Sequence, residues 1–439
     1  MPTLASANIP TPKSWDEFED IALSAAKLRW RSENFFRHGR TGQRQDGVDI
    51  FGTPDDGRQR GLQGKNTIGG AIRYLTRQPV ATNEGRAELV AGTQSRFDVR
   101  AVANAPLGSD AVDDIARLLA NGKKTAFLLR GNALHGAGLE AAGRVQARTG
   151  ARLFCDTFAP HTELGAGRVP VERIPYFAEQ IVAYLEGIEQ IILVGAKPPV
   201  SFFAYPGKPS WCAPEGCQFS HLAHPHEDGA GALAALADAL GAPAQSPVRV
   251  PLQLPGMPNG PLNALSAAQI IAELTPENVI YAEEAATSGM PLLSMLGRAR
   301  PHTHLPLTGG SIGQGLPLAV GAALAAPDRK VVCPHGDGGA AYTMQALWSM
   351  ARENLDITVV IYANRSYAIL NIELQRVGAT GAGAKALSML DLHNPEMNWV
   401  KIAEGLGVEA SRATTCEEFA AQYGSAMKHR GPRLIEVMI

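Results

Sequence analysis

The sequence predicts an α/β protein, with two doubly wound parallel-sheet domains that follow an incomplete α+β head. From about residue 111 onward, short apolar runs alternate with Ala- and Leu-rich stretches of helical character. Strand, helix, strand in repeated alternation is typical of doubly wound parallel sheets. The 46 glycines and 30 prolines indicate many tight turns, and a content of 45% hydrophobic and 19% charged residues is that of a globular protein.

The apolar runs place the individual strands and helices. Strands are expected at residues 125–131, 151–156, 190–196, 331–335 and 357–363. Helical stretches are expected at residues 137–150, 175–187 and 342–354. A chain of 439 residues is long enough for about three domains.

The residue pattern of the sequence changes near residues 65 and 110, and a Pro/Gly-rich run at 241–261 resembles a linker. We therefore divide the chain into segments 1–65, 66–110, 111–245 and 246–439. The last two are the α/β domains. Strand-like alternation in segment 66–110 contrasts with the polar, Arg-rich segment before it.

Charge and cysteine content exclude some classes of function. With 40 Lys and Arg against 42 Asp and Glu, the net charge of −2 argues against attraction of nucleic acid or membrane over the whole surface. Five scattered cysteines indicate reduced thiols, and the N-terminal residues lack the apolar core of a signal peptide. No apolar run is long enough for a transmembrane helix. We expect a cytoplasmic protein that does not contact membranes.

The sharpest chemical signal is a pair of polar residues behind two predicted strands. Asp337 lies in a Gly-Asp-Gly-Gly sequence directly after the strand at 331–335, and Asn364 follows the strand at 357–363. In a parallel sheet both strand ends reach the same edge, which is where such sheets bind ligands. A carboxylate and an amide oxygen there suit Mg2+, and glycines allow backbone N–H groups to approach a diphosphate.

A second glycine-rich turn, residues 309–317, precedes a helix and is independent of the first. With both turns present, residues from about 111 to 439 resemble the central and C-terminal domains of thiamine diphosphate-dependent enzymes. The similarity is to the proteins related to acetolactate synthase large subunits and to benzoylformate decarboxylases. The resemblance implies thiamine diphosphate and Mg2+ as cofactors, a small 2-oxo acid as substrate, and a homodimer or tetramer.

Carried over residue by residue, the resemblance implies three metal ligands: Asp337, the Asn364 side chain and the Ser366 carbonyl. It implies that the Gly310 carbonyl accepts a hydrogen bond from the aminopyrimidine and that Ile312 forces the cofactor into its bent form. The cofactor-contacting residues that it implies are Thr287, Ser288, Gly310, Ile312, Gly336, Gly338, Gly339 and Tyr367. No catalytic residue is assigned. Where the family often has a first Asn, this chain has Ala363.

In the resembled family, a Glu from an N-terminal pyrimidine-binding domain activates the cofactor, which then takes the electrons released on loss of CO2. The first 110 residues show no match to that domain. We therefore expect decarboxylase or carboligase activity to be impaired in this chain alone.

The head resembles two other families instead. Residues 14–65 resemble the start of a PD-(D/E)xK endonuclease fold, with Glu17, Glu19 and Asp49 followed by Gln63 and Lys65. Residues 65–108 resemble the plug-to-barrel passage of a TonB-dependent receptor. A chimera is the interpretation. A Mg2+-dependent endonuclease activity and no catalytic activity at all remain the alternatives to the cofactor enzyme.

Two histidine groups and a cysteine pair complete the candidates. The group at His221, His224 and His226 is metal-like in composition, although a polar turn is the favoured interpretation. Cys212 and Cys217 lack the second pair that zinc needs. His302 and His304 precede the glycine-rich turn, and either line a substrate pocket or, as we favour, lie in the core or on the surface. No motif supports a site at either residue.

Overall fold

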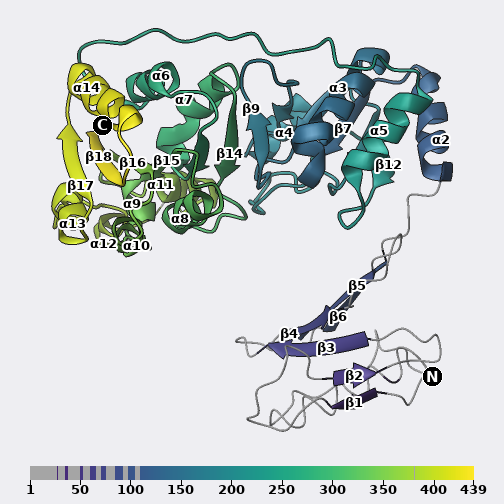
Figure 1. Cartoon of the computed structure of the whole chain (residues 1–439), viewed down its shortest axis with the longest axis horizontal. Coiled ribbons are helices and arrows are strands. Elements are labelled where there is room, and N and C mark those ends of the chain that lie inside the picture. Colours follow the sequence, from purple (N-terminus) through teal and green to yellow (C-terminus); the bar gives the residue numbers. More distant parts are fainter. Residues whose placement is uncertain are drawn as a thin grey trace. The chain divides into compact units, whose positions relative to one another are not determined.

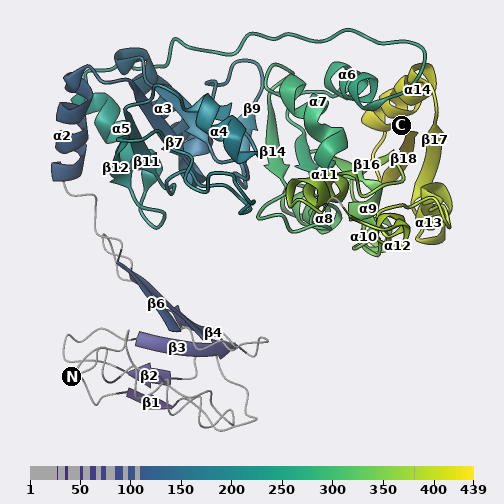
Figure 2. The same ribbon diagram turned by 180° about the vertical axis from the view of Figure 1, so that it is seen from behind.

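The computed structural model describes the backbone of residues 109–379 and 381–439 and, before them, of Lys27 and six strands. Side chains are described for Lys27 and from residue 111 on, apart from residue 380. The chain divides into two compact units, residues 1–108 and 109–439, and each is treated by itself. Figures 1 and 2 show the described elements from two sides.

The described strands of the first unit form one antiparallel sheet in which each strand pairs with the next. They are β1 (Phe35–Arg37), β2 (Ile50–Gly52), β3 (Arg60–Lys65), β4 (Ala71–Leu75), β5 (Gly85–Ala91) and β6 (Phe97–Ala103). The pairing of β3 with β4 crosses the boundary that we predicted at residue 65. Glu17, Glu19 and Asp49 lie outside the described residues, as do the side chains of Gln63 and Lys65.

The second unit contains two parallel sheets, which confirms the predicted fold class. The first sheet has the order β10-β8-β7-β11-β12, and every pairing in it is parallel. Its strands are β7 (Thr125–Leu129), β8 (Arg152–Cys155), β10 (Glu172–Arg173), β11 (Gln190–Val194) and β12 (Gln218–Ala223). The helices of this part are α2 (Ser109–Leu118), α3 (Gly136–Thr149), α4 (Ala178–Tyr184) and α5 (Gly229–Ala239).

The second sheet has the order β17-β18-β16-β15-β13-β14-β9. Its strands are β9 (Thr162–Leu164), β13 (Ile280–Glu283), β14 (His302–Pro306), β15 (Val331–Gly336), β16 (Ile357–Ala363), β17 (Glu409–Ala413) and β18 (Arg433–Met438). All pairings are parallel except that of β9 with β14. Residues 162–164 belong by sequence to the first α/β region (111–245), so one strand of that region completes the sheet of the second region (246–439).

Helices cover both faces of the second sheet. The helices are α6 (Ala264–Leu274), α7 (Ala286–Leu296), α8 (Gly315–Ala325), α9 (Asp337–Ala340), α10 (Ala346–Arg352), α11 (Ala368–Arg376), α12 (Ala384–Ser388), α13 (Trp399–Gly405) and α14 (Cys416–Lys428). Core residues of α6, α7 and α14 pack on one face, and those of α8, α10 and α13 on the other. Because both faces are covered, β16 is buried along its whole length, as a continuous apolar run requires.

Two helices of the second region begin at capping boxes that the sequence encodes. The Asn263 side chain caps α6 together with Ser266, and the Thr415 side chain caps α14 together with Glu418. The helix predicted at 342–354 is different: α9 starts directly at Asp337, and a second helix, α10, begins at Ala346. Among the described helices, none combines the length and apolar character that crossing a membrane requires.

Candidate functional site

The candidate site is built where β15 and β16 end beside each other. The two strands are parallel, and Gly336 pairs with Tyr362 in their last shared register position. Asp337 and Asn364 are the residues that continue the chain from these ends. The structure therefore brings the two predicted ligand-bearing loops to one sheet edge, because a parallel βαβ unit has no other way to arrange its strand ends.

Asp337 is a buried carboxylate, with only 3% of its surface exposed. One carboxylate oxygen accepts from the Arg365 N–H at 2.7 Å, and the other accepts from the Gly338 N–H at 2.8 Å. Burial raises the pKa of Asp337, although these two N–H groups oppose the shift. In the described part of the chain, no Lys, Arg or His forms an ion pair with it. A buried carboxylate without a cation is costly, so this geometry favours a bound cation.

Asn364 and Ser366 lie in the loop beside Asp337. The Asn364 side-chain oxygen accepts from the Ser366 N–H at 3.0 Å, while its amide nitrogen lies 3.4 Å from the Ser288 hydroxyl. Ser288 is buried in the first turn of α7, and Thr287 beside it is half-buried. The structure thus places the predicted Ser288 next to the predicted metal ligand Asn364.

The glycine-rich turn is held by Glu284, a residue that the sequence reasoning missed. Glu284 follows β13, is 4% exposed, and accepts the Gly313 N–H at 2.5 Å and the Gly315 N–H at 2.6 Å. Its carboxylate also lies 3.2 Å from the imidazole nitrogen Nε2 of the buried His335. Both oxygens are therefore engaged in shaping the turn. Two acidic residues at the end of an apolar strand were the available signal.

The Gly-Asp-Gly-Gly loop is packed too tightly for side chains. A Cβ on Gly338 would lie 2.5 Å from the Tyr367 ring, and one on Gly339 would lie 2.9 Å from a Glu284 carboxylate oxygen. We expected Tyr367 to meet a diphosphate through its backbone, but its N–H donates to the Leu390 carbonyl at 2.9 Å. That N–H is therefore engaged within the chain, and Gly336, at the end of β15, is half-buried.

Gly310 and Ile312 form the tip of the other turn. Gly310 has a φ of 66°, and its carbonyl accepts the Ile312 N–H at 2.9 Å, which leaves one lone pair for another donor. The Ile312 side chain is 41% exposed, unusual for a large apolar residue. A Cβ on Gly310 would lie 3.2 Å from the Phe202 ring, which belongs to the first α/β region.

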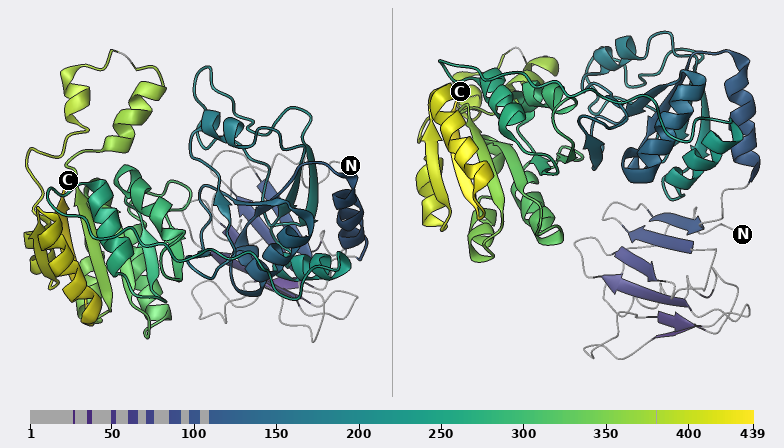
Figure 3. Two further views of the ribbon diagram at one scale, coloured as in Figure 1. Left: turned by 90° about the horizontal axis from the view of Figure 1, so that it is seen from above. Right: turned by 45° about the horizontal axis from the view of Figure 1, so that its top comes forward.

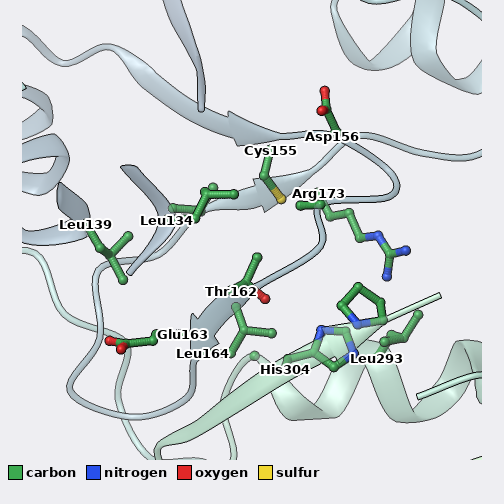
Figure 4. A pocket seen from close by; sticks show the side chains of 14 residues that line it. Leu134, Leu139, Cys155, Asp156, Thr162, Glu163, Leu164, Arg173, Leu293 and His304 are labelled. Carbon is green, nitrogen blue, oxygen red and sulfur yellow. The ribbon is translucent and has the colours of Figure 1, made fainter. Parts of the chain in front are cut away.

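A pocket of about 170 Å3 lies apart from this edge, between the first α/β region and β14 (Figure 4). Figure 4 shows Cys155, Thr162, Arg173 and His304 around it. His304 is 3% exposed, and burial lowers its pKa. His302 is equally buried, packs edge-on against Tyr281 and has a pKa lowered by burial to about 4. Both histidines are thus core residues, and His304 also lines the pocket.

The remaining candidates hold no site. His221, His224 and His226 stack with ring centroids 4.3 Å and 5.8 Å apart. In the residues that the structure describes, no group of three or more His, Cys, Asp or Glu could hold a metal. The cysteines are free thiols. A cation at Asp337 would accordingly need the amide oxygen of Asn364 and a backbone carbonyl, which are the oxygen ligands that Mg2+ accepts.

Comparison with known proteins shows what the chain resembles. Residues 286–437 match the family described as thiamine pyrophosphate enzyme, C-terminal TPP binding domain. Over 329 residues, the chain is 50% identical to IlvX of Mycobacterium tuberculosis, a protein named after the acetolactate synthase large subunit; the match covers 75% of this chain and 64% of IlvX. It is 33% identical over 181 residues to benzoylformate decarboxylase of Pseudomonas aeruginosa, covering 40% of this chain and 32% of that protein.

Solved structures show the same fold. The 4-hydroxybenzoylformate decarboxylase of Rhodococcus jostii matches with a TM-score of 0.62 at 23% identity, over 76% of this chain and 64% of the other. Benzoylformate decarboxylase of Polynucleobacter necessarius has a TM-score of 0.62 at 21% identity, over 83% and 66%. The chain thus spans about two thirds of the length of these relatives. The comparisons thus support a family-level similarity to thiamine diphosphate-dependent acetolactate synthases and 2-oxo acid decarboxylases.

Proposed function

We propose, from the place of residues 286–437 in the thiamine pyrophosphate enzyme family, that the chain binds thiamine diphosphate and Mg2+ at the carboxyl edge of the second sheet. The observation that carries the proposal is Asp337: a carboxylate 3% exposed, without a cationic partner among the described side chains, at the strand end beside Asn364. The reaction class is decarboxylation of a 2-oxo acid, with carboligation as in acetolactate formation.

Residues at the carboxyl edge would bind the metal and the diphosphate. Asp337, the Asn364 amide oxygen and the Ser366 carbonyl would hold Mg2+, and Mg2+ shares the diphosphate oxygens. Backbone groups of Gly336, Gly338 and Gly339 would contact the diphosphate, and at Gly338 and Gly339 the closeness of Tyr367 and Glu284 excludes any side chain. Thiamine diphosphate, when bound, supplies the electron sink for loss of CO2.

The glycine-rich turn would hold the other end of the cofactor. The free lone pair of the Gly310 carbonyl would accept from the aminopyrimidine, and the exposed Ile312 side chain would press on the bent molecule. Glu284 fixes this turn through the Gly313 and Gly315 N–H groups. Because both of its oxygens are engaged, Glu284 is no candidate for the glutamate that activates the pyrimidine. That role stays unassigned, and we expect weak turnover from this chain alone.

Titration calorimetry with thiamine diphosphate, with and without Mg2+, tests the proposal. We expect Mg2+-dependent binding that Asp337→Asn weakens strongly and that Asp156→Asn, at the other sheet, leaves unchanged. Absence of binding to the intact chain in saturating Mg2+ would contradict the assignment. Turnover of pyruvate and benzoylformate is the second measurement, because relatives are named for acetolactate synthesis and for benzoylformate decarboxylation. Rates at the level of intact family members would refute the expected impairment.

The oligomeric state is part of the same proposal. We expect a homodimer or tetramer, because family members place the cofactor between subunits. Light scattering at several protein concentrations, with and without cofactor, distinguishes these states from a monomer.

A further inference from the structure

Helix α11 continues directly from the candidate metal loop, yet burial does not hold it in place. Its N-cap is Tyr367, three residues after Asn364, and none of its nine residues is buried. Figure 3, left, shows α11 and α12, in lime, standing off the second sheet. A surface helix normally keeps its position through an apolar face. The half-buried α11 therefore relies on polar contacts as well. The loop from Asn364 to Tyr367 also bonds directly to Leu390 and Leu392.

The charged side chains of α11 are held by the first α/β region. Arg376, in the last turn, binds Glu179 through two parallel hydrogen bonds of 2.8 Å and 2.9 Å. Its guanidinium lies 4.2 Å from the Phe177 ring centroid and 4.6 Å from that of Tyr205. A bidentate ion pair whose guanidinium also stacks on aromatic rings fixes the orientation of the two side chains as well as their distance.

Glu373, one turn earlier on the same helix, adds two more bonds. Its carboxylate oxygens accept from the Tyr176 hydroxyl at 3.0 Å and from the Tyr205 hydroxyl. We name the five residues Tyr176, Glu179, Tyr205, Glu373 and Arg376 the α11 clamp. The Arg376 guanidinium holds the pKa of Glu179 at about 2, so the ion pair persists throughout the neutral range.

The same part of the first region reaches the opposite side of the site. Phe202 touches the glycine-rich turn at Gly310. Its ring lies 4.7 Å from that of Phe158 and 6.2 Å from that of the clamp residue Tyr176, centroid to centroid. One surface of the first α/β region thus lies against both the glycine-rich turn and helix α11, which continues from the Asn364–Tyr367 loop.

We propose that Arg376 and Glu373 are positioning residues: by fastening α11 to the first α/β region, they hold the Asn364–Tyr367 loop in the arrangement that accepts a metal and a diphosphate. The affinity part rests on the proposed function. The ordering of the loop does not, because it concerns this chain alone. Without the clamp, the competent loop arrangement becomes a minor fraction of the population, and apparent affinity falls by that fraction.

The chain offers a matched control with the same chemistry. Arg152 binds Glu172 through two hydrogen bonds of 3.0 Å and 2.6 Å, and Glu172 also accepts from the Tyr184 hydroxyl at 2.6 Å. The Arg152 guanidinium likewise stacks on Phe154 and Tyr184. This cluster lies wholly within the first α/β region and contacts no part of α11.

The experiment compares Arg376→Gln with Arg152→Gln in the full chain. Hydrogen exchange of the ligand-free protein should speed up in residues 364–376 of Arg376→Gln alone. The dissociation constant for thiamine diphosphate in saturating Mg2+ should rise about tenfold, as expected if the competent loop is then populated about a tenth of the time. Arg152→Gln should change neither. The charge-swapped pair Glu179→Arg with Arg376→Glu should restore part of both effects.

Several outcomes overturn the proposal. If exchange rises in Arg376→Gln while affinity stays at the wild-type value, the clamp only joins the two regions. If exchange in residues 364–376 does not change, the clamp does not order the loop. Should Arg376→Gln fail to fold, Arg376→Lys and Glu373→Gln replace it, with the same two measurements. If wild type itself does not bind the cofactor, the proposed function fails, and the exchange result alone decides whether Arg376 orders the loop.

Discussion

The carboxyl edges of the two parallel sheets each carry an aspartate directly after a strand, but only one of these aspartates has a cationic partner. Asp156 follows β8 directly, as Asp337 follows β15. Asp156 is paired with Arg130, which follows the neighbouring strand β7, and its side chain is 25% exposed. Asp337 is 3% exposed, and the strand beside it is followed by the neutral Asn364. The first edge is neutralised within the chain, whereas the second leaves a carboxylate for an external cation.

This difference separates a structural edge from a binding edge within one fold. Doubly wound sheets offer a ligand position at every carboxyl edge, so position alone does not identify a site. Here the deciding features are that no described cationic side chain pairs with Asp337 and that glycines in both turns lie too close to their neighbours for a Cβ. Substitutions made in parallel at the two edges test this difference.

The largest effect is expected at the two aspartates themselves. Asp337→Asn removes the charged ligand, which should weaken Mg2+-dependent binding of thiamine diphosphate by about 100-fold, equivalent to about 3 kcal/mol. Asp156→Asn should leave the affinity unchanged, because Asp156 is already paired with Arg130 of the same chain and needs no external cation. Calorimetric titration of both variants measures this. Equal losses in the two variants would show that the two edges do not differ in function.

A loss of stability is expected from Glu284→Gln. The amide keeps one acceptor but turns its NH2 toward one of the N–H groups of Gly313 and Gly315, inside the core. An unsatisfied buried donor of this kind should lower the free energy of unfolding by about 3 kcal/mol. Glu140→Gln is the control from the first region, where a half-buried carboxylate accepts the Ser246 N–H at 2.7 Å. Its cost should stay below about 1 kcal/mol because water can replace the lost bond.

Urea denaturation of both variants at pH 7 provides the two free energies. If Glu284→Gln costs no more than Glu140→Gln, the glycine-rich turn keeps its shape without the carboxylate. The assignment of Glu284 as the residue that fixes the turn would then be wrong.

Local sequence signals predicted the strands and the placement of Asp337 and Asn364 at one edge of the sheet. The run at 357–363 is apolar throughout and forms β16 with those bounds, because a central strand is buried on both faces. The pairing of the two loops followed from parallel topology alone. These inferences needed only neighbours in sequence and a general rule of sheet geometry.

Features that depend on contacts distant in sequence could not be predicted. The pairing of β9 with β14 joins residues 162–164 to residues 302–304, and the bond between Arg376 and Glu179 joins two different regions. Neither has a local pattern, since a three-residue strand and an ion pair between residues about 200 positions apart have no signature in the neighbouring sequence. The role of Glu284 depends on a turn about thirty residues away.

The comparison extends to the interiors of the two regions. Among the described residues of the first α/β region, no acidic or histidine side chain is buried, whereas the second region buries Glu283, Glu284, His302, His304, His335, Asp337 and Glu436. Burial lowers the pKa of His302 to about 4 from 6.5. As the pH falls, His302 therefore takes up a proton in the unfolded chain before it does so in the folded chain. Its neutral form contributes fully to the free energy of unfolding above pH 6.5, and this contribution is lost between pH 6.5 and about 4.

At pH 5 this histidine alone should cost the wild type about 2 kcal/mol relative to pH 7. His302→Asn keeps an N–H near the Arg300 carbonyl, which His302 Nδ1 contacts at 2.7 Å, and removes the titration. Denaturation of wild type and variant at pH 7 and pH 5 measures the difference in slope. His226→Asn, at an exposed position in the first region, should leave the slope unchanged. Identical slopes for wild type and His302→Asn would contradict the expectation.

The smallest effect is expected at Gly310, where the Phe202 ring lies close to the glycine-rich turn. Gly131 and Gly310 have φ values of 65° and 66°, so alanine should cost about 1 kcal/mol at either position. A Cβ on Gly131 meets nothing within 4 Å, whereas one on Gly310 lies 3.2 Å from Phe202. Gly310→Ala should therefore cost about 0.5 kcal/mol more, and that excess should vanish when Phe202→Ala is also present. Urea denaturation of the four variants completes the cycle. An excess that survives Phe202→Ala would mean that Phe202 does not press on the turn, and the contact between the first region and the cofactor edge would then rest on the α11 clamp alone.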